Sequence, residues 1–82
     1  MFSNKNLSVI SFANGWTMWH YVDNGLPIEK LNESFFSQVK NLMNPGDKVL
    51  ISLKGWWIEA IITMINDGKV YLTYITKTPL GE

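Results

Sequence analysis

The chain has 82 residues, no cysteine and a formal net charge of zero, with seven Lys and no Arg against seven Asp and Glu. This length allows one domain, residues 1–82, and leaves no room for a second core. The absence of cysteine excludes disulfides and thiolate metal sites. Because His20 is the one histidine, a zinc site would consist almost entirely of carboxylate ligands, which is rare. Because the lysines are spread singly, no basic patch for nucleic acid is expected. We therefore expect no cofactor, no metal and no nucleic acid.

A chain this short buries only roughly 60–65% of the surface that it exposes when unfolded, so its own core is a marginal source of stability. Oligomerisation is the remaining way to compensate. The 4 Trp, 4 Phe and 3 Tyr beside only 17% charged residues leave two interpretations open. All four indoles fill one core, or one or two lie on a contact surface.

The opening segment, Met1–Phe12, is too polar for a signal peptide. No stretch approaches the roughly 18 apolar residues that span a membrane. We expect a protein that is made in the cytoplasm and does not enter membranes.

The first elements in chain order are two strands, Asn6–Ala13 and Gly15–Val22, which follow an N-terminal arm at residues 1–6. Between them, Asn14-Gly15 is a turn signal because both residue types tolerate positive φ. The pattern predicts a β-hairpin.

A change of period from Ile28 onwards predicts a helix. Pro27 suits a first helical turn, and apolar residues then recur at spacings of three and four, at Ile28, Leu31, Phe35, Val39 and Leu42. Asn32 and Ser34 disfavour helix interiors, so we expect one helix or two short pieces of it. Asn44-Pro45-Gly46 ends the helical segment.

The strongest β signal is a three-stranded meander over Val49–Leu53, Trp56–Ile65 and Lys69–Thr76. Asp67-Gly68 predicts a type I′ turn between its last two strands, and residues 78–82 form a tail. The fold class is therefore α+β and mainly β. We expect a small antiparallel sheet or partly open barrel of about five strands, with one helix, whole or broken, between strands 2 and 3.

The long strand Trp56–Ile65 carries bulky apolar residues at both parities. One face, which we predict to be core, holds Trp56, Ile58, Ala60, Ile62 and Met64. The opposite face holds Trp57, Glu59, Ile61, Thr63 and Ile65. Since a half-exposed strand usually alternates apolar and polar residues, either this strand is covered on both sides or its outer face is a docking surface.

Catalytic patterns are not found. His20 and Asp23 lie three residues apart, which in a strand puts them on opposite faces. Asp47 beside Lys48 is best explained as a surface pair. The phosphate-binding and nucleophile motifs are also missing. We expect a protein that is not an enzyme.

Two family resemblances follow from the residues. The segment from Gly46-Asp47 through Gly55-Trp56-Trp57 to Val70-Tyr71-Leu72 resembles SH3-like domains of the Tudor or chromo-barrel kind. That resemblance implies an aromatic groove or cage for a peptide or methylated lysine, formed by Trp57, Tyr71 and Tyr74.

A longer stretch resembles a family of small phage virion proteins. It runs from Trp19-His20-Tyr21 through Phe35-Phe36 to Pro45-Gly46-Asp47-Lys48-Val49. The family pattern is a Trp-x-Tyr strand, a short helix with a Gly-Tyr-Phe-like element and a Val-Gly-Asp strand start. Here Ser34, Phe35 and Pro45 stand where the family has glycine, tyrosine and valine. Such proteins are similar to head decoration, or cement, proteins.

The phage resemblance implies a structural protein on the outer surface of a bacteriophage capsid. Its partners would be the major capsid protein and its own copies, as a homotrimer. The contact residues that we expect are Trp57, Ile61, Ile65, Trp16 and Trp19. Two alternatives remain open, which are the SH3-like peptide-binding module and a single-strand nucleic-acid binder that stacks bases, although zero net charge disfavours the last.

Overall fold

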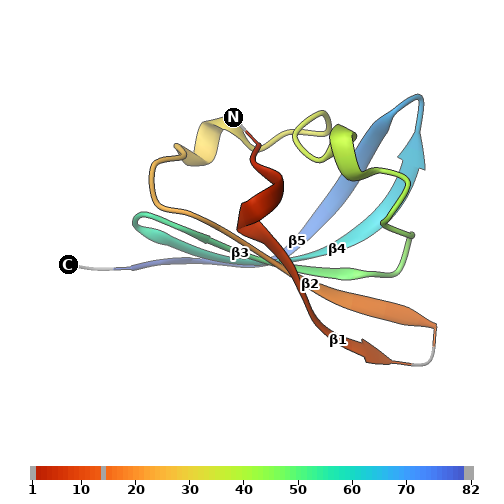
Figure 1. The fold of residues 1–82 in the computed structure, drawn as a ribbon. Helices are drawn as coiled ribbons and strands as arrows, with labels where there is room; N and C mark the ends of the chain where they lie inside the picture. Colours follow the sequence, from red (N-terminus) through yellow and green to blue (C-terminus); the bar gives the residue numbers. More distant parts are fainter. Residues whose placement is uncertain (1, 14, 81–82) are drawn as a thin grey trace.

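Five strands form one open sheet in the computed structural model, which describes residues 2–13 and 15–80 (Figure 1). Their order across the sheet follows the sequence. The strands are β1 (Leu7–Ala13), β2 (Trp16–Asp23), β3 (Lys48–Leu53), β4 (Trp56–Asn66) and β5 (Lys69–Pro79). The mainly β architecture is confirmed. The end of β5 shows that the predicted tail begins too early.

The sheet is mixed rather than antiparallel. β2 and β3 run parallel, while the other three neighbouring pairs are antiparallel. Parallel neighbours require a long crossover connection, and the segment 24–47 provides it. The prediction of a purely antiparallel sheet is therefore wrong, and the sheet does not close into a barrel because β1 and β5 remain its two edges.

The predicted first hairpin and the predicted three-stranded meander are both present. β1 pairs with β2. Gly15 of their turn has a φ of 89°, while Asn14 lies outside the described residues, as do Met1 of the predicted arm and Gly81–Glu82 of the predicted tail. Asp67 and Gly68 have φ angles of 55° and 77°. These two positive values are what a type I′ turn between β4 and β5 requires, so this prediction is confirmed.

No α-helix forms within the described residues of the crossover. The chain makes two single 3₁₀ turns, η2 (Ile28–Lys30) and η3 (Ser37–Val39). The break predicted near Asn32 does occur, because its side-chain oxygen accepts a hydrogen bond from the Ser34 N–H at 2.8 Å. Such local hydrogen bonds compete with those of an α-helix. Because only 3₁₀ turns form in the crossover, the prediction of a helix is wrong.

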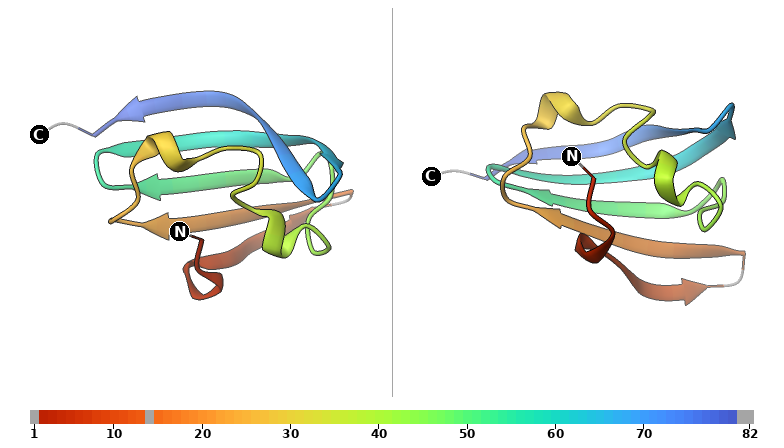
Figure 2. Two further views of the ribbon diagram at one scale, coloured as in Figure 1. Left: turned by 90° about the horizontal axis from the view of Figure 1, so that it is seen from above. Right: turned by 45° about the horizontal axis from the view of Figure 1, so that its top comes forward.

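The crossover and the N-terminal residues cover one face of the sheet (Figure 2). Phe35 and Phe36 pack edge-to-face with ring centroids 5.1 Å apart, and Phe2 stacks on Tyr21 at 5.2 Å. The 3₁₀ turn η1 (Asn4–Asn6) connects Phe2 to β1. Because Phe2 belongs to the core cluster, the predicted N-terminal arm contributes to the core. Leu42, predicted to be inward, is instead 62% exposed, because irregular backbone does not keep a helical period.

Candidate protein-binding surface

The opposite face of the sheet is not covered by other segments of the described chain. The N-terminal residues and the crossover lie on the same side of the sheet in all three ribbon views (Figures 1 and 2). Their buried residues join a single cluster with alternate residues of the strands. We call the other side the bare face. From β2 to β5 it carries Trp16, Met18, His20, Val22, Lys48, Leu50, Ser52, Trp57, Glu59, Ile61, Thr73, Thr76 and Thr78.

The pairing registers place these side chains in rows across the sheet. One row contains Met18, Lys48 and Ile61, and the next contains His20, Leu50 and Glu59. Directly paired residues share a face and lie close enough to interact. Apolar groups therefore surround one cation and one anion, and the centre of the bare face has no net charge.

Trp57 is one of two tryptophans on the bare face and lies near the β3–β4 turn, in the row that contains Val22, Ser52 and Thr78. It is half-buried, and its ring lies 5.8 Å from the His20 ring, measured between centroids. The His20 Nε2 atom is covered and has no hydrogen-bond partner among the described residues. A base or metal ligand needs an accessible nitrogen with a positioned partner. His20 is therefore better explained as packing support for Trp57.

Three of the five predicted contact residues lie on the bare face. Trp16, Trp57 and Ile61 are all half-buried there, whereas Met18 and Leu50, which share the face, were missed by the sequence reasoning. A signal for Leu50 was present in the sequence, because Lys48 and Ser52 have its parity in β3 while Val49, Ile51 and Leu53 have the other. The parallel pairing with β2 places Leu50 beside His20, and this neighbour was not predictable from local periodicity.

The prediction that Trp19 lies on a contact surface is wrong. Trp19 is 7% exposed, and its indole Nε1–H donates a 3.0 Å hydrogen bond to Oδ2 of Asp47. The Asp47 carboxylate is itself buried and also accepts the backbone N–H groups of Thr17 and Asn44, each at 3.0 Å. The suggestion that Asp47 is a surface partner of Lys48 is wrong as well. This carboxylate joins β2, the end of the crossover and the start of β3.

The placement of Ile65 on the outer face is also wrong. A register shift between Ile62 and Met64 leaves Thr63 as an extra residue in β4. Such a bulge reverses the parity of the residues that follow it. Ile65 consequently packs against the core cluster, and Met64, predicted to be core, is 46% exposed.

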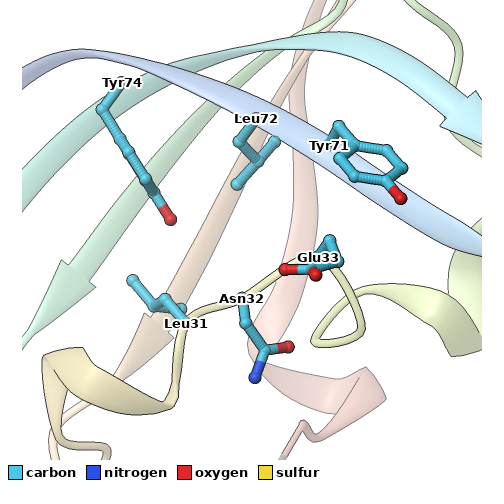
Figure 3. Close-up of a pocket in the computed structure, with 6 residues that line it drawn as sticks. All are labelled: Leu31, Asn32, Glu33, Tyr71, Leu72 and Tyr74. Atoms are coloured by element: carbon cyan, nitrogen blue, oxygen red, sulfur yellow. The ribbon is translucent and has the colours of Figure 1, made fainter.

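The covered side holds two shallow grooves. The first, of about 230 Å³, lies between the loop Leu31–Glu33 and β5, which contributes Tyr71, Leu72 and Tyr74 (Figure 3). The second, of about 260 Å³, is lined by Phe2, Lys30, Asn32, Ser34, Phe35 and Gln38. Both volumes fall below the roughly 300–1,000 Å³ that is typical of small-molecule sites.

The described residues do not bring together the side chains of the other candidate sites, which are the aromatic cage, the His20–Asp23 pair and a metal site. Tyr71 and Tyr74 line the first groove, but Trp57 lies on the opposite face of the sheet, so the predicted aromatic cage does not form. His20 and Asp23 also lie on opposite faces, as their spacing predicts. Among residues 2–13 and 15–80, three or more metal-ligating side chains do not gather anywhere, and a helix long and apolar enough to cross a membrane is likewise not found.

Comparisons with protein-family models, curated proteins and solved structures find no match to this chain.

Proposed function

We propose that this chain is a non-enzymatic structural protein that binds another protein through the bare face. The partner that the phage resemblance implies is the major capsid protein, and the role is that of a decoration, or cement, protein on the outer surface of the head. The observation that supports the proposal is the set of half-buried apolar groups on the bare face, Trp57 among them, which the described part of the chain leaves without a covering layer.

Physical chemistry favours a protein partner for this surface. The apolar groups of the bare face are interrupted by Lys48, Glu59 and the threonines of β5. Protein–protein interfaces combine apolar and polar groups in this way, and Trp is enriched among the residues that dominate binding energy. Contiguous apolar patches larger than a few hundred Å² on small proteins usually mark such contacts.

The decisive experiment uses assembled shells of the major capsid protein whose gene neighbours that of this chain. Purified chain is mixed with the shells, and the bound fraction is measured by co-sedimentation. Wild type should bind, and Trp57→Ala should weaken binding at least about 30-fold, the equivalent of losing a hot-spot residue worth about 2 kcal/mol.

Leu42→Ala is the matched control, because Leu42 is 62% exposed but lies in the crossover, away from the bare face. It should bind as wild type does. Equal binding by wild type and Trp57→Ala would contradict the docking role of the bare face. Failure of wild type to bind the shells would contradict the capsid partner.

A further inference from the structure

The two edges of the sheet differ in how they are protected against further strand pairing. β5 has charges at Lys69 and Lys77 and Pro79 at its end. The start of β5 is paired with the crossover, because the Val70 N–H donates a hydrogen bond to the Glu33 carbonyl at 2.8 Å. Charge, proline and a covering loop are devices that stop edge strands from pairing with other chains.

β1 is the less protected edge. Its seven residues, Leu7–Ala13, include no charge, no proline and no glycine. A bulge at Ile10 is its one protective feature, and β5 has a similar bulge at Ile75. Uncharged segments of this length with high β-propensity pair readily when they are exposed at an edge.

The outer side of β1 has backbone groups that no other described segment pairs with, and two of its apolar side chains are partly exposed. Among the described residues, β1 pairs only with β2, and no backbone hydrogen bond from another segment reaches it. Every second residue of an edge strand directs its N–H and C=O away from the sheet. Val9 and Ile10 are 41% and 48% exposed in the same strand. The edge therefore offers both a hydrogen-bonding ladder and apolar area.

We propose that β1 pairs with β1 of a second copy of this chain, antiparallel and across a two-fold axis, so that two sheets become one. Self-pairing suits this strand because an uncharged segment meets its own copy without the repulsion that like charges cause when directly opposed. Lys5, just before β1, would lie opposite the far end of the other strand. Val9 and Ile10 of both copies would become covered.

The pairing would also make the bare faces of the two copies continuous, because both belong to the same extended sheet. This contact is isologous, since the same strand serves both partners. The trimer implied by the phage resemblance would instead need a head-to-tail contact between β1 and a different surface. The protection of β5 argues against β5 as that surface. Edge pairing does not depend on what binds the bare face.

Native mass and sedimentation measurements test the pairing. Wild type should be a dimer, and Val9→Lys should raise the dissociation constant at least about tenfold, because it introduces a charge into each of two strands that otherwise pair without any. The matched control is Ile75→Lys, in which the substituted residue is 51% exposed on the other edge. It should leave the dimer intact, as should Trp57→Ala.

Single cysteines locate the axis, because the natural chain contains none. Ser8→Cys, Val9→Cys, Ile10→Cys and Ser11→Cys are oxidised separately, with Thr76→Cys in β5 as the control. A disulfide-linked dimer is expected from at least one β1 variant, since directly opposed strand residues meet the geometric requirement, and not from Thr76→Cys. A monomeric or trimeric wild type, or a dimer that survives Val9→Lys, would overturn the proposal.

Discussion

Both faces of the sheet carry large apolar side chains, but only one of them is covered by other segments of the described chain. On the covered face, Tyr21, Phe36 and Ile58 are fully buried by segments of the same chain. On the bare face, Trp57 and Ile61 are only half-buried, and the crossover and N-terminal residues lie on the other side of the sheet. Apolar residues at both strand parities indicate that both faces favour contact with other groups, while the path of the crossover decides which face stabilises the monomer. The other face is left for a partner.

The largest expected effect comes from removing an aromatic ring on the covered face. Phe36→Ala should lower the free energy of unfolding by about 3–5 kcal/mol, because it leaves a cavity in a ring cluster that cannot fully collapse. Ile61→Ala on the bare face should cost about 1 kcal/mol, since its side chain is only half-buried. Urea unfolding followed by far-UV circular dichroism measures both.

Phe36→Leu, with a smaller cavity, keeps the measurement possible if the alanine variant does not fold. Equal losses from Phe36→Leu and Ile61→Ala would show that the two faces contribute alike, and would break the comparison.

A smaller effect on stability is expected at Asp47, whose carboxylate connects β2 to the end of the crossover. Asp47→Asn keeps the side-chain shape, but its amide nitrogen cannot accept a hydrogen bond. At least one N–H donor would lose its partner, at a cost of about 1–3 kcal/mol. Unfolding monitored by the fluorescence of the indoles, including Trp19, measures the change.

Asp67→Asn is the control for Asp47→Asn, because Asp67 is exposed and asparagine also accepts the positive φ of a type I′ turn. Its effect should stay within about 0.5 kcal/mol. If both variants were equally stable, the buried carboxylate would not be the link that its three hydrogen bonds indicate.

The smallest expected effect is a change in how stability depends on pH, and it concerns Tyr74 at the rim of the covered face. Burial raises the pKa of Tyr74 above its ordinary value. A group with a raised folded-state pKa gives its full contribution to stability below the unfolded pKa, about 10 for tyrosine, and loses that contribution as pH rises through the folded pKa. Stability should therefore decline in alkaline solution, and Tyr74→Phe should reduce the decline. Urea midpoints from pH 8 to 11 measure the difference, and identical pH profiles would contradict it.

The sequence by itself determined the strands and two of their turns. Alternation and β-branched residues placed Trp56–Ile65 and Lys69–Thr76 within a few residues of β4 and β5, because such patterns act over short distances. The same short-range rules placed the positive φ angles at Asp67 and Gly68. They also placed Trp57 and Ile61 on the side of β4 opposite its core residues.

Only the tertiary structure decided which aromatic groups remain accessible. Trp19 lies three residues after Trp16 and therefore on the opposite face of β2, but that this face is the covered one depends on the crossover, and its indole N–H is accepted by Asp47, which is distant in sequence. The bulge in β4 moved Ile65 to the core side. The crossover passed over one face without forming the helix that its period suggested. Each outcome depends on contacts between distant residues, which local periodicity does not encode.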